Sequence, residues 1–445
     1  MRKFSKQREE NRFCTASSTH SLVPSVRRLW FRAIRFLQIY GLGQGLRRLK
    51  TDGKVFFVRR VQRIINNRKY RADIESLSEI LHSHSGFFDC SFSPIGWNTK
   101  MFQRYQHMSN AMSVLGGLSL YGGNPRMDTS LFVYFPVHQN LYVFDATDKF
   151  IKQKLLETLS KSKSPVIVRL YSVDMNIGFA QVMEWLKRGF HVVYEYIDLL
   201  TPEISGFIPK VILFRHEQIL RNEKIFVVAT SNRLLDDVKR YRSKNFILNT
   251  NGVDVSHWTN FSDVCPSDMQ PIVSTGRHIV GYHGTLAEWI DYECLRAIAE
   301  DGKYELVLIG LEHDTSFRRS GLHHHPRVHY LGSKPYYMLN EYAARYDVAI
   351  LPFIKTDVTD TVSPVKIFEY MASGKPIVTT DLLECQKYRS CLIAHDTHEF
   401  LKNLEKALAY RKEAWYRSLL ATEAQENSWQ QKAKEILRFI GMTPL

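Results

Sequence analysis

The chain has 445 residues, 44% of them hydrophobic and 24% charged, with a formal net charge of +15. This length exceeds one typical core, so we expect two domains with additional segments. No apolar run approaches the roughly 20 residues that span a bilayer, and the first thirty residues lack the apolar core of a signal peptide. The six cysteines form no CxxC pair, which favours a reducing compartment over a disulfide framework or a zinc site.

The positive charge lies in an N-terminal arm. Residues 1–72 hold 19 Lys and Arg against three Asp and Glu, whereas the remainder holds 41 against 42. Residues 22–40 and 55–65 are predicted to be basic amphipathic helices, which are typical of segments lying on anionic membranes. We therefore expect residues 22–65 to bind an anionic membrane surface. Packing on the body and nucleic-acid binding are the alternatives, but no nucleic-acid motif is present and we expect no such partner.

Strands and helices alternate along two stretches of the chain, separated by a polar linker at residues 256–277. The first stretch predicts strands at 87–92, 118–121, 131–135, 141–144, 166–170, 191–197, 225–230 and 246–249, and helices at 101–115, 152–160, 180–188, 210–221 and 232–241. The second predicts strands at 279–283, 304–309, 328–331, 348–353, 377–380 and 392–394, and helices at 289–300, 335–346, 397–410 and 430–440. Such alternation indicates an α/β fold of two Rossmann-like, doubly wound domains facing a cleft.

The stretch TVSPVKIFEYMASGKPIVTT, residues 361–380, reads as loop, helix, tight stop and strand. We expect Ser363 to be the N-cap and Pro364 to occupy the first helical position. A helix N-terminus at the carboxyl edge of a sheet favours phosphate binding, and Lys366 adds a positive charge there. Glu369 is suited to accept two sugar hydroxyls. In the alternative interpretation, Lys366 and Glu369 are an ordinary surface pair three residues apart.

SPVKIFEYMASGKPIV resembles the nucleotide-sugar signature of retaining glycosyltransferases with the B-type (GT-B) fold, particularly family 4. The resemblance implies a hexosyltransferase-type enzyme in which Glu369 binds the ribose of a nucleotide-diphosphate sugar. It places Ser363, Val365 and the catalytic Lys366 at the diphosphate. Many members carry another Glu eight positions before Glu369, at the place of Thr361 in this chain. The resemblance therefore assigns Thr361 to the donor sugar, with its contact in question.

Two further segments resemble the same family. Gly96-Trp97 with Phe102-Gln103-Arg104 is similar to the first loop and helix of one sub-branch, which puts Gly96 and Arg104 on the acceptor or phosphate side. A helix-surface Arg is the alternative. The segment from His283 and Gly284 onward resembles the opening of the second domain, but it lacks the Arg and Lys that clamp the diphosphate in many members. His283 and Gly284 are therefore expected at the nucleotide sugar.

The catalytic group of the first domain is expected to be Asp174 or Asp198, since each follows a predicted strand and is placed to steer an acceptor hydroxyl. The three histidines 323–325 are interpreted as a solvated loop, and Asp357 and Asp360 as loop residues. We expect no metal and no cofactor besides the nucleotide-sugar co-substrate.

The predicted domains are a basic extension (1–84), an acceptor domain (85–262), a nucleotide-sugar domain (263–425) and a helix crossing back to the acceptor domain (426–445). The expected function is sugar transfer, with retention of configuration, to a glycan or lipid-linked acceptor in cell-surface polysaccharide or glycolipid biosynthesis. The expected location is the cytoplasmic face of the membrane, as a peripheral protein. The alternative is a catalytically weak binding module recruited to a membrane complex.

Overall fold

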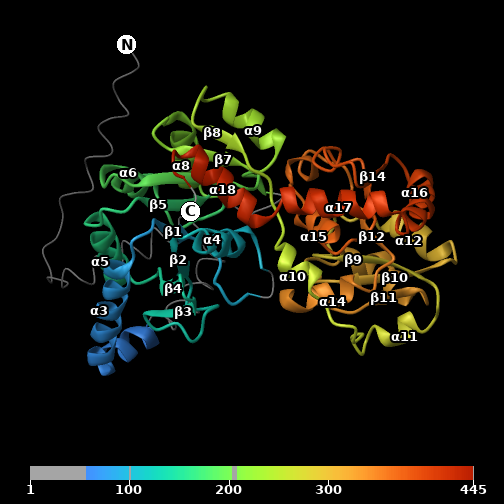
Figure 1. Cartoon of the computed structure of the whole chain (residues 1–445), viewed down its shortest axis with the longest axis horizontal. Helices are drawn as coiled ribbons and strands as arrows, with labels where there is room; N and C mark the ends of the chain where they lie inside the picture. Colours follow the sequence, from blue (N-terminus) through green and yellow to red (C-terminus); the bar gives the residue numbers. More distant parts are fainter. Residues whose placement is uncertain (1–56, 100–101, 203–207, 444–445) are drawn as a thin grey trace, which may run out of the picture. The chain divides into compact units, whose positions relative to one another are not determined.

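The computed structural model describes residues 57–99, 102–202 and 208–443. The chain divides into two units, residues 1–65 and 66–445. In the first unit, residues 57–65 are helical, and Phe57, Ile64 and Ile65 are exposed. The predicted helix at 22–40 lies outside the described residues, so membrane binding by the arm stays a prediction. The second unit contains two α/β domains, each built around one sheet (Figure 1).

The first sheet has eight strands in the order β3-β4-β2-β1-β5-β6-β7-β8. All neighbours are parallel except β3 and β4, which are antiparallel. The strands are β1 (Phe88–Phe92), β2 (Leu118–Gly123), β3 (Tyr134–His138), β4 (Leu141–Asp145), β5 (Val166–Tyr171), β6 (His191–Tyr196), β7 (Phe226–Ala229) and β8 (Phe246–Leu248). The helices are α4 (Arg104–Val114), α5 (Lys149–Ser160), α6 (Phe179–Lys187), α8 (Lys210–Arg221) and α9 (Asn232–Lys239).

The second sheet has six parallel strands in the order β11-β10-β9-β12-β13-β14. The strand order reverses between β9 and β12, which is where open α/β sheets bind ligands beyond their carboxyl ends. The strands are β9 (His278–His283), β10 (Tyr304–Ile309), β11 (Val328–Tyr330), β12 (Val348–Leu351), β13 (Ile377–Thr380) and β14 (Cys391–Ala394). The helices are α12 (Tyr292–Glu300), α13 (Ser316–Ser320), η1 (Leu322–His324), η3 (Thr359–Thr361), α15 (Val365–Ala372), α16 (Thr397–Tyr410) and α17 (Ala414–Glu426). The expected pair of doubly wound domains is confirmed.

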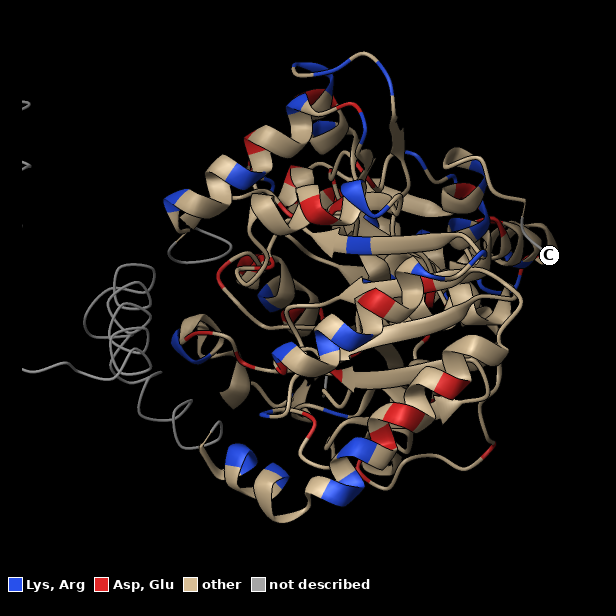
Figure 2. Cartoon of the chain, turned by 90° about the vertical axis from the view of Figure 1, so that its left-hand side faces the viewer, with Lys and Arg blue, Asp and Glu red and all other residues tan. Residues whose placement is uncertain are grey.

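The end of the predicted N-terminal extension is an ordered helix on the first domain. Helix α3 (Asn67–Ser83) buries Ile74, Leu77 and Leu81 in the same hydrophobic cluster as the first sheet. Lys and Arg occupy its first turns, whereas Asp and Glu follow further along (Figure 2). Residues 67–83 therefore pack on the first domain, and the alternatives for residues 22–65 stay open.

The polar stretch 256–277 is not a simple linker, contrary to expectation. It contains most of α10 (Val255–Thr259) and all of α11 (Gln270–Val273), and Trp258 is fully buried in the core of the second domain. The polar composition of this stretch gave no sign that Trp258 is a core residue. The helix expected at 335–346 is also shorter: η2 (Tyr336–Met338) is followed by α14 (Leu339–Ala343).

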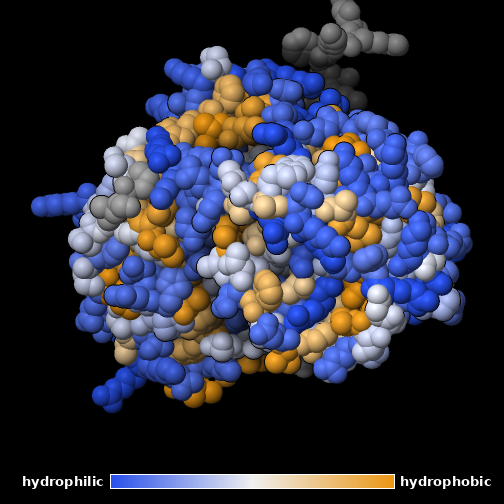
Figure 3. All heavy atoms as spheres, turned by 45° about the vertical axis from the view of Figure 1, so that its right-hand side comes forward, coloured by the Kyte–Doolittle hydropathy of each residue, from blue (hydrophilic) through white to orange (hydrophobic). Residues whose placement is uncertain are grey.

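The last helix of the chain returns to the first domain. Helix α18 (Trp429–Phe439) packs against α4 of the first domain, where Trp429, Ala433 and Ile436 meet Met108 and Met112. Within the described residues, no helix is long and apolar enough to cross a membrane. The face in Figure 3 is largely hydrophilic, with separate hydrophobic patches.

Candidate active site

A cavity of about 310 Å³ lies where the carboxyl ends of the two sheets face each other. From the first domain it is lined by the start of α4 and by the residues that follow β6. From the second domain it is lined by the residues that follow β9 and β10, by the 333–339 segment and by α15. The lining residues are Phe102, Gln103, Arg104, Tyr105, Ile197, Asp198, Asn251, His283, Gly284, Thr285, Ile309, Gly310, Leu311, Ser333, Lys334, Tyr336, Leu339, Val365, Lys366 and Glu369.

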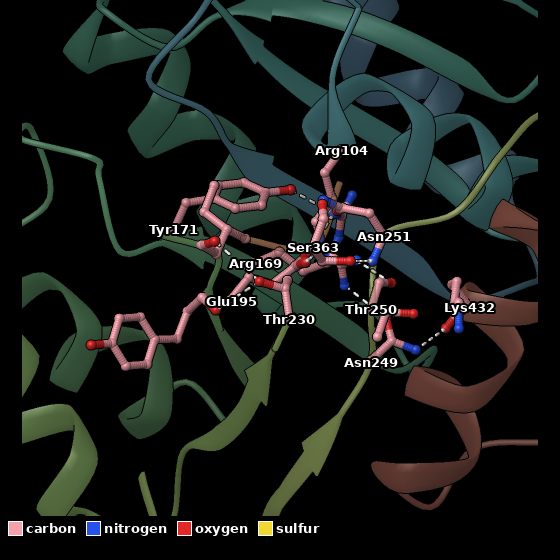
Figure 4. Close-up of polar contacts among 12 residues, drawn as sticks. Arg104, Arg169, Tyr171, Glu195, Thr230, Asn249, Thr250, Asn251, Ser363 and Lys432 are labelled. Carbon is pink, nitrogen blue, oxygen red and sulfur yellow. Dashed lines mark hydrogen bonds and ion pairs between the residues drawn. The ribbon is translucent and has the colours of Figure 1, made fainter. Parts of the chain in front are cut away.

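Helix α15 brings the predicted signature to this cavity, but its N-terminus is built differently from the expectation. Pro364, not Ser363, is the N-cap residue, and no side chain caps the first turn. The Ser363 hydroxyl instead accepts a hydrogen bond from the backbone N–H of Asn251 (3.0 Å), and Asn251 Nδ2 donates to the Ser363 carbonyl (2.7 Å; Figure 4). Ser363 therefore ties α15 to the segment that follows β8. The uncapped first turn keeps the positive end of the helix dipole available to an anion.

Glu369 is held by a histidine from the neighbouring strand. His283, at the end of β9, lies 2.9 Å from Glu369 Oε2 through Nε2, and both side chains are almost fully buried. Trp258 stacks on the His283 ring, with 5.1 Å between centroids and 16° between planes. Burial alone would raise the pKa of Glu369, but the hydrogen bond from His283 and the charges of His283 and Lys366 bring it below its ordinary value. Glu369 is thus a fixed, ionised acceptor.

Lys366 lies against the backbone at the tip of β9. Gly284 has a φ of +152°, and a Cβ at this position would lie 2.0 Å from Lys366 Cε. The positive φ favours glycine at this position, and the lysine chain passes close against it. Burial lowers the pKa of Lys366, and the nearby Glu369 partly offsets that effect. The predicted set of Lys366, Glu369, His283, Gly284 and Val365 lines one cavity.

Arg104 also lines the cavity, and its guanidinium group belongs to a buried hydrogen-bond network. Its Nε donates to Glu195 Oε2 (2.6 Å), Nη1 to the Thr250 carbonyl (2.9 Å) and Nη2 to Asn249 Oδ1 (2.7 Å; Figure 4). The side chain is 4% exposed. All three guanidinium nitrogens are engaged within the protein, so Arg104 acts as a structural link. The surface-Arg alternative is wrong because the side chain is buried. These bonds use three of the five guanidinium N–H groups, so a ligand role of Arg104 stays a prediction.

The two aspartates proposed as the catalytic group of the first domain differ in their position relative to the cavity. Asp198 lines the cavity, and burial raises its pKa to about 6. Asp174 does not line it: its Oδ1 accepts from the backbone N–H of Asn176 (2.7 Å), and burial raises its pKa as well. The sequence placed both after strands, and only the tertiary structure distinguished them.

Two other predicted residues lie away from the cavity lining. The backbone N–H of Gly96 donates to Met127 Sδ (3.1 Å), and a Cβ there would lie 2.7 Å from Asp128 Oδ2. The glycine is therefore needed for packing against the 127–128 turn. Thr361 is 1% exposed, and its hydroxyl donates to the Val358 carbonyl (2.6 Å). Thr361 does not line the cavity, so the structure gives no support to its expected contact with the donor sugar.

The 333–339 segment is a part of the site that sequence reasoning missed. Lys334 lines the cavity but donates to Asp268 Oδ2 (2.6 Å), and Tyr336 accepts a hydrogen bond from Trp258 Nε1 (3.0 Å). The available signal was position: this segment follows β11, so it lies at the ligand edge of the sheet.

Comparisons with known proteins identify a related domain and a shared fold. The family model described as Glycosyl transferases group 1 matches residues 277–410. TuaH of Bacillus subtilis (strain 168), named as a teichuronic acid biosynthesis glycosyltransferase, is 22% identical over 173 residues. That match covers 37% of this chain and 43% of TuaH, so it spans less than half of the relative's length.

Solved structures show the same fold. Sucrose-phosphate synthase from Thermosynechococcus elongatus superposes with a TM-score of 0.57 at 15% identity, over 80% of this chain and 98% of that one. Anabaena HepE in complex with UDP gives a TM-score of 0.55 at 15% identity, over 80% and 99%. HepE has also been solved with UDP-glucose. Residues 277–410 thus form a glycosyl transferases group 1 domain, and the chain has the two-domain fold of GT-B glycosyltransferases.

Proposed function

We propose that the protein transfers a hexosyl unit from a nucleotide-diphosphate sugar to a glycan or lipid-linked acceptor, with retention of anomeric configuration. The observation that carries the proposal is the shared cavity, in which α15 presents Lys366 and Glu369 and the first domain presents Asp198. The name of TuaH and the ligands of HepE support this chemistry. By analogy with TuaH, the product belongs to a cell-surface polysaccharide or glycolipid.

Catalysis in this proposal is mainly electrostatic. As the bond between the anomeric carbon and the diphosphate oxygen breaks, negative charge grows on the leaving diphosphate. Lys366 and the free N–H groups of the first turn of α15 stabilise that charge. Glu369, fixed by His283, accepts the ribose hydroxyls. Because these groups supply the positive charge, we expect transfer to proceed in the presence of EDTA.

Asp198 is the group proposed to steer the acceptor. Its carboxylate, on the opposite wall, accepts a hydrogen bond from the attacking hydroxyl, whose oxygen bonds to the anomeric carbon on the face that the diphosphate leaves. The hydroxyl proton passes to the departing phosphate oxygen or to Asp198. Closure of the two domains excludes water and limits hydrolysis of the donor.

The basic arm suggests where the acceptor is found. Each Lys or Arg near an anionic surface contributes about 1 kcal/mol to binding, so the charges of residues 22–65 are sufficient for reversible attachment at the cytoplasmic face. Vesicle sedimentation with and without residues 1–65 tests this part. Retained binding of the truncated protein to anionic vesicles contradicts it.

A binding module with little catalytic activity remains the second candidate, for a specific reason. Thr361 does not line the cavity, and Arg104 and Lys334 donate to protein acceptors, which reduces the positive charge available to a diphosphate. Nucleotide binding without transfer to acceptors from cell extract favours this candidate.

The decisive experiment is a thermal-shift panel of UDP, GDP and ADP and their hexose conjugates, followed by NMR of the anomeric product. We expect one nucleotide family to raise the melting temperature and the product to keep the donor configuration. Glu369→Gln abolishes that shift while the exposed Glu405→Gln preserves it. If the folded protein responds to no nucleotide, the proposal fails. An inverted product removes the retaining assignment alone.

A further inference from the structure

Two polar side chains on the first-domain wall of the active-site cavity keep unbonded oxygen atoms. Tyr105 of α4 and Asp198, which follows β6, both line this cavity. Within the described part of the chain, no hydrogen bond or ion pair engages the Tyr105 hydroxyl or the Asp198 carboxylate. Neither group belongs to the polar atoms that are unbonded and also closed off from solvent. Their oxygen atoms therefore keep surface through which an occupant of the cavity can bond.

The other polar side chains of that wall already have tasks. The side chain of Gln103 accepts a hydrogen bond from the first turn of α4. Arg104 donates from all three guanidinium nitrogens to protein acceptors. Asn251 Nδ2 donates to the segment before α15, and Asn251 Oδ1 is closed off from solvent. The hydroxyl of Tyr105 and the carboxylate of Asp198 are thus the groups on this wall that are most available to a ligand.

The Tyr105 ring is held in place by its neighbours. It is 3% exposed and meets the Tyr171 ring edge-on, with 4.4 Å between centroids and 76° between planes. Tyr171 is itself fixed, because its hydroxyl accepts a hydrogen bond from Arg169 Nη1 at 2.6 Å (Figure 4). Ile197, the residue before Asp198, packs against the same aromatic cluster. The two oxygen-bearing groups are therefore presented by one well-packed part of the first domain.

The two groups differ in what they offer to a ligand. Burial raises the pKa of Tyr105 well above its ordinary value, and the charge of Asp198 is the next cause, so the hydroxyl keeps its proton. Because Coulomb interactions weaken with distance, this effect places the two groups near each other. The pKa of Asp198 is raised to about 6, so this carboxylate is mainly ionised at pH 7. Tyr105 can thus donate to a hydroxyl or accept from one, whereas Asp198 accepts.

We propose that Tyr105 is a second acceptor-binding residue, whose hydroxyl bonds to the ring hydroxyl beside the attacking one while Asp198 receives the attacking hydroxyl. The acceptor class that fits is a pyranose with free hydroxyls on two adjacent carbons. One sugar ring can reach both groups because they lie close together. The acceptor role rests on the proposed function, whereas the binding of two hydroxyls at this wall does not.

The test compares Tyr105→Phe with the unchanged full-length chain. The probes are the methyl pyranosides of glucose, galactose, mannose and N-acetylglucosamine. Saturation-transfer NMR measures their binding in the presence of UDP, GDP or ADP, and their turnover is measured with the matching hexose donors. We expect at least one pyranoside to bind, and Tyr105→Phe to weaken its binding and its kcat/KM about three- to tenfold, as the loss of one hydrogen bond does.

Two controls separate ligand binding from a structural role. The Tyr105 hydroxyl bonds no described protein group, so the unfolding midpoint and the donor hydrolysis rate of Tyr105→Phe are expected to stay unchanged. Tyr121 belongs to the same cluster, but its hydroxyl donates to Ser93 (2.8 Å) and to the Ile95 carbonyl (3.0 Å). Tyr121→Phe is expected to lower the unfolding midpoint and to leave pyranoside binding unchanged.

Deoxy analogues of the pyranoside that binds identify the contact. The analogue without the hydroxyl beside the attacking one is expected to bind the unchanged chain about three- to tenfold more weakly, and Tyr105→Phe should weaken it no further.

Three results overturn the proposal: no pyranoside binds, Tyr105→Phe weakens the complete and the deoxy pyranosides equally, or it weakens the nucleotide sugar and not the pyranoside. The last result assigns the Tyr105 hydroxyl to the donor sugar. A chain that transfers no sugar, but whose pyranoside binding is weakened by Tyr105→Phe, refutes the proposed function and keeps the hydroxyl site.

Discussion

The two domains that enclose the candidate active-site cavity differ in where their buried charges lie. In the first domain, Arg169 donates to Asp89 (2.7 Å) and to Glu195 (3.0 Å), and Arg104 closes the network on Glu195 (Figure 4). In the second domain, the charges of Lys366 and Glu369 reach the cavity itself. The buried ion pairs of the first domain thus hold its sheet together, whereas Lys366 and Glu369 of the second domain line the cavity, as does Asp198 of the first.

The physical difference lies in how completely each charge is neutralised. Burial alone would raise the pKa of Glu195, but Arg104 and Arg169 hold it below its ordinary value. The hydrogen bonds of that network leave little capacity for a ligand. Within the described part of the chain, Glu369 is the one opposing charge that acts on the pKa of Lys366, so a diphosphate can still gain from the lysine charge. A charged residue at the carboxyl edge of a sheet is therefore not by its position alone a ligand-binding residue.

The largest effect on stability is expected in the buried ion-pair network around Arg169. Arg169→Met leaves Asp89 and Glu195 buried beside each other with less compensation, which typically costs about 3–5 kcal/mol of unfolding free energy. Urea denaturation measures it. Arg221→Met, which breaks an exposed pair with Glu217, is the control and is expected to cost about 0–1 kcal/mol. Equal effects would break the comparison.

The next largest effect is expected on the rate of catalysis, at Lys366 of the second domain. Lys366→Met removes the charge aimed at the leaving diphosphate and is expected to lower kcat about 10²–10³-fold, with little change in the unfolding midpoint. Steady-state kinetics with the donor found in the nucleotide panel measure it. Lys303→Met, at an exposed pair with Glu405, serves as the control. A large loss of stability with unchanged kcat would place Lys366 with the structural charges.

The pH profile sharpens the comparison further. The pKa of Asp198 is raised to about 6 by burial, so the carboxylate form is lost as the pH falls through 6. We expect kcat/KM to rise with pH through this range, and Asp198→Asn to remove that limb. Asp174→Asn, at a buried carboxylate outside the cavity, is expected to keep it. If kcat/KM of the Asp198→Asn variant still rises with pH in this range, the proposed steering role of Asp198 is wrong.

The smallest effect is expected on nucleotide affinity, at the contact between Asn251 and Ser363. Asn251→Ala removes the hydrogen bond to the Ser363 carbonyl, and Ser363→Ala removes the one that starts from the backbone N–H of Asn251. Each bond contributes about 0.5–1.5 kcal/mol, so we expect nucleotide Kd to rise a few-fold in each variant. Isothermal titration measures both. Unchanged affinity in the double variant shows that α15 keeps its position without this contact.

The sequence by itself determined the features that depend on local order. The alternation of apolar strands and helices predicted both doubly wound domains, and SPVKIFEYM predicted a helix with Lys366 and Glu369 on the ligand side. These residues lie within one helical turn of each other, so their relation is fixed by the helix and not by the fold around it.

The tertiary structure decided everything that depends on partners distant in the chain. Arg104 meets Glu195 and Thr250, Ser363 meets Asn251, and Asp198 reaches the cavity while Asp174 does not. A side chain with several donors or acceptors fits a ligand or a buried network equally well in sequence, and only the neighbours brought by folding decide between them. His107 of α4 and His257 of α10 line one cavity although they lie on different domains, so no local pattern could have joined them.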